Sequence, residues 1–88
     1  MKDFIQLHEN DNVVVALKNL EKDSIIEING NTVQLKSDIG FGHKIAIKPI
    51  KAGKKILKYG LSIGTATQNI AVGEHVHVQN LETDYSIK

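Results

Sequence analysis

The chain has 88 residues and a net charge of +1, so a single domain is expected and a general attraction to nucleic acid is not. A domain of this size buries only about 60% of the surface that its unfolded chain exposes. It has little room for an enclosed substrate pocket, and any catalytic site is therefore expected to be shared with a partner. Cysteine is absent, which excludes disulfides and thiolate metal sites and suits a cytoplasmic location. No segment is long and apolar enough to span a membrane.

Short segments rich in Ile and Val predict β-strands, which these β-branched residues favour. Residues 13–17 are apolar on both alternating faces, so they are expected to form a strand buried on both sides. Residues 25–28 and 32–35 are the next two predicted strands. Asn29-Gly30 between them is a hairpin signal, because both residue types tolerate a positive φ.

The rest of the chain repeats one pattern: an apolar residue, two others, a glycine, two others and an apolar residue. Copies lie at residues 39–47, 50–57 and 70–78, and a fainter copy at 20–25 has Asp23 in the place of the glycine. Glycine adopts turn conformations that β-branched residues cannot, and Asp does so more weakly. Each copy therefore predicts a strand, a tight turn and a second strand, with the apolar residues on either side of the turn, such as Leu20 and Ile25, in the core.

No window of about eleven residues shows a helical period. The sequence therefore predicts one compact all-β domain over residues 1–88, with an ordered core at about 4–81 and a loose tail at 82–88. Gly60 and Gly64 are expected to serve turns.

His75 and His77 are the most informative candidates for chemistry. Residues two apart on a strand share a face, so these imidazoles are expected to lie together with Gln79, while Val76 and Val78 enter the core. Two imidazoles at this spacing can converge on one metal ion or one anion, although a metal site needs at least a third ligand. The alternative is a pair of solvent-facing histidines.

A second candidate lies in the turn of the copy at residues 39–47. There His43 can act as an acid, a base or a ligand, and Lys44 can neutralise a carboxylate; the alternative is an ordinary surface turn. The lysines between residues 44 and 58 form a basic stretch, interpreted as solvated surface, as a phosphate-binding patch or as a contact for an anionic substrate. Tyr59 is expected to cover the edge of the core.

Several segments, taken in order, resemble one family. They are Leu7-His8, Asp11-Asn12-Val13, Gly42-His43-Lys44, Lys58-Tyr59-Gly60, Ile63-Gly64 and Gly73-Glu74-His75-Val76-His77. Over residues 5–81 or so, the chain is similar to the small N-terminal domain of altronate and galactarate dehydratases, a family that also includes a sulfolactate sulfo-lyase. Each motif is short, but their order and spacing together are specific.

The resemblance implies a SAF-like β-clip domain that works with a larger part carrying much of the active site, in some members as separate small and large subunits. Members eliminate water, or sulfite in the sulfo-lyase, and the dehydratases typically use a divalent metal, usually iron. The chain is therefore expected to be the small subunit of a sugar-acid dehydratase, inactive alone. Its expected partners are the large subunit and a hexonate or aldarate substrate, and a homo-oligomer is compatible with this interpretation.

The site residues that the resemblance implies fall into three groups. They are His43 and Lys44 as catalytic residues, His75 and His77 as metal ligands, and Tyr59, Gln79 and Asn80 at the substrate or subunit interface. The alternative holder of the iron is the large subunit. Gln79 stands where the family commonly has a further histidine, and an amide is a poorer ligand for iron than imidazole. If that histidine is a required ligand, the chain has an altered activity or substrate.

Three other interpretations stay open at this point. The first is the small subunit of a sulfolactate sulfo-lyase, and the second is a non-catalytic SAF-like binding module. The third is a biotinyl- or lipoyl-carrier domain, which also uses such glycine turns but modifies a lysine at an exposed hairpin tip. Lys44 lies between His43 and Ile45, whereas carriers typically place the modified lysine beside Met, Asp or Ala.

Overall fold

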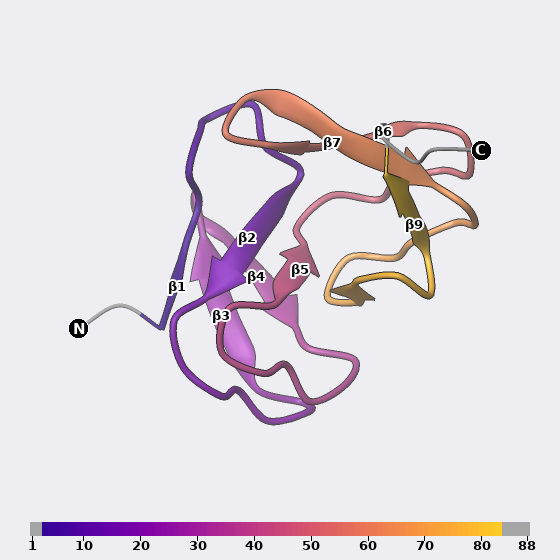
Figure 1. Ribbon diagram of the computed structural model, residues 1–88. Helices are drawn as coiled ribbons and strands as arrows, with labels where there is room; N and C mark the ends of the chain where they lie inside the picture. The colour runs from indigo at the N-terminus through magenta and orange to yellow at the C-terminus, as the bar shows by residue number, and fades with distance from the viewer. Residues whose placement is uncertain (1–2, 84–88) are drawn as a thin grey trace.

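The computed structural model describes residues 3–83, and over that range the chain is entirely β, as the sequence predicts. Nine short strands form three small antiparallel sheets (Figure 1). The strands are β1 (Phe4–Ile5), β2 (Val13–Ala16), β3 (Ile25–Ile28), β4 (Asn31–Gln34), β5 (Lys44–Ala46), β6 (Lys55–Lys58), β7 (Leu61–Ala66), β8 (His75–Val76) and β9 (Leu81–Thr83). No helix within this range is long and apolar enough to cross a membrane.

The central sheet has the strand order β1-β2-β5-β8, so two segments far apart in the sequence, β5 and β8, pair directly. The β3–β4 hairpin lies to one side of this sheet, and the sheet with the order β6-β7-β9 lies to the other (Figure 1). In the register of the central sheet, Ile45 pairs with Val14 on one side and with His75 on the other. This register is what places a histidine beside the end of β5.

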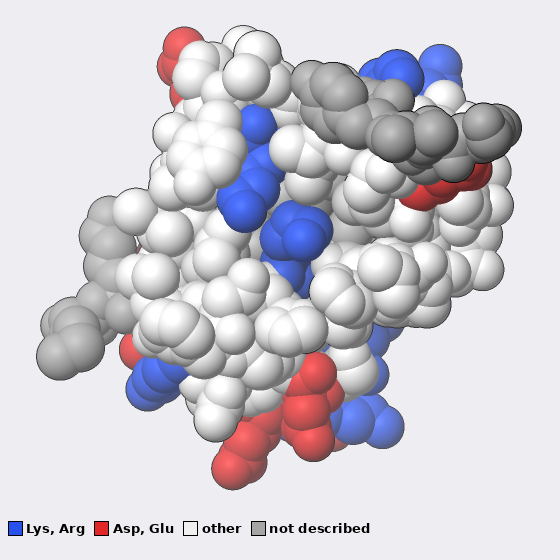
Figure 2. Space-filling view, in the orientation of Figure 1, with Lys and Arg blue, Asp and Glu red and all other residues white. Residues whose placement is uncertain are grey.

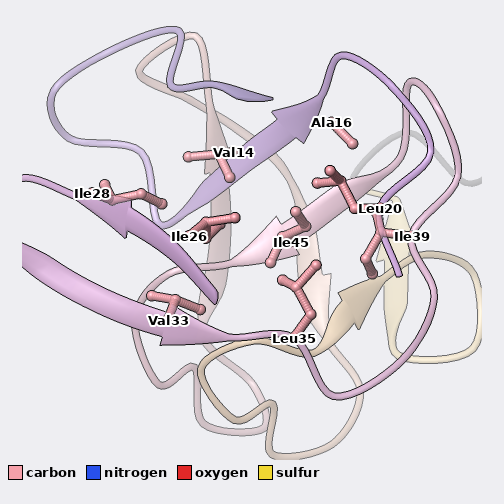
Figure 3. Close-up of a cluster of buried hydrophobic side chains, with 9 residues drawn as sticks. All are labelled: Val14, Ala16, Leu20, Ile26, Ile28, Val33, Leu35, Ile39 and Ile45. Atoms are coloured by element: carbon pink, nitrogen blue, oxygen red, sulfur yellow. The ribbon is translucent and has the colours of Figure 1, made fainter. Parts of the chain in front are cut away.

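Each face of the central sheet packs on its own hydrophobic core, because successive strand residues point to opposite faces. Val14 and Ile45 enter the first core, under the β3–β4 hairpin (Figure 3). Val13 and Ala46 enter the second core, against β6 and β7. Aliphatic side chains fill both cores. The fully or nearly buried members are Val14, Ala16, Leu20, Ile26, Ile28, Val33, Leu35, Ile39 and Ile45 in the first, and Val13, Ala46, Ile50, Ile56, Ala66, Ile70 and Val76 in the second.

The repeated unit of the sequence is a structural unit as well. Its turn residues Gly42, Gly53 and Gly73 all have a positive φ, and so does Asp23 in the fainter copy, at 71°. The two halves of the chain also repeat their hydrogen bonds. The Gly42 amide donates to the Ala16 carbonyl in the first half, and the Gly73 amide donates to that of Ala46 in the second. The isolated bridges Leu20–Ile39 and Ile50–Ile70 repeat in the same way.

Some sequence expectations are wrong in detail, and strand geometry explains them. Ile26 rather than Ile25 follows the Asp23 turn into the core, and Ile25 is 68% exposed because alternate residues of β3 face solvent. Leu17 lies beyond the end of β2 and is exposed.

The expected tail and one of the expected turns also differ from the structure. Glu82 and Thr83 lie in β9 rather than in a tail, and residues 84–88 are outside the described range. Gly64 lies within β7, where a Cβ atom would come within 2.6 Å of the Glu82 carbonyl oxygen. Its role is therefore the close approach of β9 and not a turn.

Candidate functional site

Three histidines meet at one edge of the central sheet: His43 from the turn before β5, His75 from β8 and His77 just after it. The Nδ1 atom of His43 lies 2.8 Å from the Nε2 atom of His75. The ring of His77 lies with its centroid 5.0 Å from that of His43 and 5.5 Å from that of His75. One nitrogen from each ring can be chosen so that all three lie within 4.8 Å of one another. The sequence predicts the pair His75–His77, and the structure adds His43 to it.

A buried amide places His77, because β8 is too short to do so. The strand ends at Val76, which is fully buried as expected, whereas Val78 is 75% exposed and does not enter the core. The chain turns here: the His77 amide donates to Oδ1 of Asn80 at 3.0 Å, and Nδ2 of Asn80 donates to the His75 carbonyl at 2.9 Å. Asn80 is only 1% exposed. It thus shapes the histidine turn from inside the fold.

Gln79 contacts the cluster as well. Its Nε2 lies 3.3 Å from Nδ1 of His75 and 3.2 Å from the His75 carbonyl oxygen. An amide nitrogen can only donate, so Nδ1 of His75 accepts and its Nε2 carries the proton that is donated to Nδ1 of His43. This tautomer is inferred from the hydrogen bonds. Gln79 therefore orients an imidazole, which is a task that does not require it to be a metal ligand.

Burial and the neighbouring charges favour the neutral form of His75. Burial lowers the pKa of His75 below its ordinary value of 6.5, and the neighbouring charges of His43, His77 and Lys44 lower it further. Neutral imidazole is the form that binds a metal or accepts a proton. Burial also lowers the pKa of Lys44, and the positive charge of Lys58 adds to that effect.

Lys44 and His43 leave the chain in opposite directions, although they are adjacent in the sequence. Lys44 pairs with Val76, a residue of the second core, while Ile45 pairs with His75 and enters the first core. The side chain of Lys44 therefore starts on the face of β5 that meets β6 and β7. Lys44 is half-buried within a strand and not at a hairpin tip, which argues against a carrier domain.

The segment from His8 to Asn12 supports the β6–β7 hairpin. Asp11 is completely buried, and its carboxylate accepts hydrogen bonds from the amides of Tyr59 at 3.0 Å and Gly60 at 2.7 Å. The ring of His8 packs on Gly60, where a Cβ atom would come within 2.9 Å of it. The sequence predicts a turn at Gly60 and places Tyr59 at the edge of the core, but it does not indicate that Asp11 and His8 contact this hairpin. The signal in the sequence is a charged residue, Asp11, two positions before an apolar strand, and only the fold shows what it contacts.

The donor set of the cluster fits a divalent transition metal. Imidazole nitrogen suits Zn, Fe, Ni and Cu, and three such ligands leave positions open for substrate oxygen. Nitrogens about 2 Å from one ion in tetrahedral geometry are about 3.3 Å apart, so the 2.8 Å hydrogen bond between His43 and His75 has to open slightly. The cluster that the described residues form contains no carboxylate. It can hold an ion, but its ligand types do not single out iron.

The fold and the site together define a small β domain that presents three imidazoles at a sheet edge. Residues 2–84 match the altronate/galactarate dehydratase SAF domain, and the chain belongs to that family. It is 45% identical over 86 residues to altronate dehydratase of Bacillus subtilis (strain 168), a match that covers 98% of the chain. It is 42% identical over 83 residues, or 94% of the chain, to altronate dehydratase of Escherichia coli (strain K12). The chain spans only 17% of each of these two relatives.

The chain is also similar to proteins that are themselves short subunits. It is 46% identical over 48 residues to (2R)-sulfolactate sulfo-lyase subunit alpha of Paracoccus pantotrophus, which is 54% of this chain and 72% of that subunit. The corresponding subunit of Chromohalobacter salexigens is 42% identical over 50 residues, covering 57% of this chain and 53% of that subunit. By name, these relatives are dehydratases and sulfo-lyases.

Proposed function

We propose that the chain is the small SAF-type subunit of a sugar-acid dehydratase that works in the cytoplasm with a separate large catalytic subunit. The observation that carries the proposal is the cluster of His43, His75 and His77. Two segments that are distant in the sequence form this cluster, in a chain of the dehydratase family. A separate small subunit is supported by the likeness to sulfo-lyase subunits that are themselves short. An altronate-like hexonate is the proposed substrate, because the two dehydratase matches cover nearly the whole chain.

Dehydration of a sugar acid removes a proton from the carbon beside the carboxylate and a hydroxyl group from the next carbon. His43, His75 and His77 would hold a divalent metal, iron by family resemblance, which when bound would polarise substrate oxygens. The low pKa of His75 keeps a neutral imidazole available at neutral pH. His77 is the exposed member of the cluster, so this ligand would lie on the side from which substrate approaches. The ammonium of Lys44 would stabilise the negative charge that develops on the substrate carboxylate.

The test is reconstitution with the large subunit. The chain is to be co-expressed and purified with the matching large subunit, and dehydration of altronate is to be followed by the 2-keto acid formed. We expect activity only in the complex, and a loss of at least about 100-fold in kcat for His43→Ala or His77→Ala. His8→Gln is the matched control, because His8 is a histidine outside the cluster. Failure of the subunits to associate, together with no elimination from any sugar acid, would contradict the proposal.

Metal binding by the chain alone is a second readout. In equilibrium dialysis with Fe²⁺ or Zn²⁺, wild-type chain is expected to bind one ion, and His75→Ala is expected to bind at least about tenfold more weakly. Absence of binding by the wild-type chain would place the metal on the large subunit instead, and unchanged binding in the His43, His75 and His77 alanine variants would place it elsewhere on this chain.

A second candidate function is the small subunit of a sulfo-lyase, because two sulfo-lyase alpha subunits match the chain. The reconstituted complex distinguishes the two activities: release of sulfite from (2R)-sulfolactate supports the sulfo-lyase, and formation of a keto acid from altronate supports the dehydratase. A non-catalytic binding module would instead retain its binding after replacement of both His75 and His77.

A further inference from the structure

Two strand edges face each other across a groove beside the first core. One wall of the groove consists of residues 3–6, which include β1, and the other consists of residues 27–29, from β3 and its turn. Within residues 3–83, β1 has only β2 as a hydrogen-bonded neighbour, and β3 has only β4. The edges of β1 and β3 that face the groove are therefore unpaired (Figure 1). An unpaired edge is a template on which another strand can pair.

On the β1 wall, the register shows which backbone groups point into the groove. The Leu17 amide donates to the Asp3 carbonyl at 2.8 Å, so Asp3 belongs to a hydrogen-bonded pair of the β1–β2 ladder. Such pairs alternate along an antiparallel ladder, so the next residue, Phe4, directs its amide and carbonyl away from β2. Its partner Ala16 fits this alternation, because the amide and carbonyl of Ala16 both bond to the turn before β5.

The β3 wall presents its backbone in the same way. The Leu35 amide donates to the Ser24 carbonyl at 2.9 Å, which fixes the alternation along the β3–β4 ladder. Glu27 therefore directs its amide and carbonyl away from β4, and its partner Thr32 directs its own away from β3, to the outer edge of β4. Ile25 points its backbone groups to the same edge as Glu27, and its side chain is 68% exposed. Both walls thus offer donors and acceptors to an added strand.

The two walls run in the same direction and leave space for one strand between them. At one end, Nδ2 of Asn29 donates across the groove to Oε1 of Gln6 at 3.2 Å. At the other end, Asp3 lines a second hollow together with residues 24–26. β1 and β3 are therefore parallel to each other, so one added strand can run antiparallel to both. Two side chains fit between the backbones at Gln6 and Asn29, which is too wide for direct pairing, whereas two strands that flank a third are about 9.6 Å apart.

The side chains of the walls indicate what kind of segment fits. Phe4 and Ile28 pack in the first core, so the floor of the groove is apolar. Glu27 is exposed and gives one wall a negative charge. Figure 2 shows lysine side chains gathered in a recess near the middle of the viewed face, with acidic side chains toward the margins. An extended segment with apolar residues toward the floor and a basic residue beside Glu27 complements this groove.

We propose that the groove between β1 and β3 binds an extended segment of the large subunit, which pairs antiparallel with both strands and places a basic side chain beside Glu27. The inference rests on the proposed function for the identity of the partner. The chain spans only 17% of the length of each of the two dehydratases that it matches, and the remainder of those proteins corresponds to the proposed large subunit. The groove lies at the β1 edge of the central sheet, whereas β8 with His75 forms the opposite edge. Binding in the groove therefore leaves the histidine edge free for substrate.

The experiment measures the affinity of the full chain for the purified large subunit by isothermal titration calorimetry. Glu27→Pro removes an amide that points into the groove and is not used in the β3–β4 ladder, so binding is expected to weaken at least about tenfold. Thr32→Pro is the matched control: it alters the other member of the same residue pair, whose amide points to the outer edge of β4, and should leave the affinity unchanged. Equal affinities of the two variants would overturn the proposal.

Amide hydrogen exchange of the ¹⁵N-labelled wild-type chain gives a second readout, which needs no substitution. In the complex, the amides of Phe4 and Glu27 are expected to exchange at least about tenfold more slowly than in the free chain, and that of Thr32 at the same rate. Unaltered exchange at Phe4 and Glu27 in a complex that forms would overturn the proposal. Glu27→Lys tests the charge and is expected to weaken binding at least about fivefold, with the exposed Glu9→Lys as the control for net charge.

The outcomes distinguish this inference from the proposed function. A complex that forms through the groove but eliminates water from no sugar acid counts against the proposed function and not against the groove. An active complex in which Glu27→Pro and Thr32→Pro have the same affinity counts against the groove and not against the proposed function. Failure of the subunits to associate would contradict both.

Discussion

The two hairpins of this domain share one geometry but achieve it by different means. β3–β4 turns through Asn29-Gly30 and β6–β7 turns through Tyr59-Gly60, and all four residues have a positive φ. Asn-Gly is the strongest short-range signal for such a turn, and the first hairpin needs little help beyond it. Tyr-Gly is not such a signal. The second hairpin depends on a buried carboxylate forty-eight residues away in the sequence, which accepts the amides of its turn.

The comparison shows how a local preference can be overruled and at what cost. The carboxylate of Asp11 is removed from water to hold the Tyr59 turn, and hydrogen bonds to backbone amides offset part of that desolvation. A turn that tertiary contacts must hold is free to carry a side chain that the turn alone would reject.

Removal of the buried carboxylate is expected to give the largest loss of stability, because only the second hairpin depends on it. Asp11→Ala leaves two buried amides without an acceptor, so we expect the free energy of unfolding to fall by about 3 kcal/mol in urea denaturation followed by far-UV circular dichroism. Asp38→Ala is the control. Asp38 accepts a single bond from the exposed Lys22 amide, and its loss should cost less than about 1 kcal/mol. Equal losses in the two variants would contradict the role assigned to Asp11.

Matched glycine substitutions compare the stability of the two hairpin turns directly, with a smaller expected effect. Gly30→Ala meets no atom within 4 Å and is strained only through its positive φ, for about 1 kcal/mol. Gly60→Ala has the same backbone strain and also brings a methyl group within 2.9 Å of the His8 ring, so we expect about 2 kcal/mol. The measurement is the difference between the two midpoints in urea. A larger loss for Gly30→Ala would show that the His8 contact does not matter.

The smallest expected effect concerns the histidine cluster between the two halves. The folded state lowers the pKa of His75 below 6.5, so the unfolded chain binds more protons in that region of pH. Stability of the metal-free chain is therefore expected to be highest above about pH 7 and to fall as the pH drops through about 6.5. His75→Gln should flatten this dependence. Stability that rises on acidification from pH 7 to 5 would contradict the direction of the shift.

Much of the fold could be predicted from the sequence, because it depends on local rules. The Asn29-Gly30 turn, the positive φ of Asp23 in a glycine position and the aliphatic cores all follow from residue type and spacing. The same rules fail where the chain leaves regular geometry. Val78 was expected to be buried by extending a strand that ends at Val76, and the structure replaces the strand by a turn held by Asn80.

For the site, the residue types and the pairs that share a strand face could be predicted from the sequence alone. The sequence brought His75 and His77 together because side-chain direction alternates along a strand. Only the tertiary structure decided that His43 joins them, since the pairing of β5 with β8 links segments 32 residues apart. It also decided that Lys44 starts on the face of β5 that meets β6 and β7, and that Asp11 accepts the amide of Tyr59. The reason is physical: contacts between distant segments depend on strand register and on which core each face buries, and neither is encoded in any short stretch of sequence.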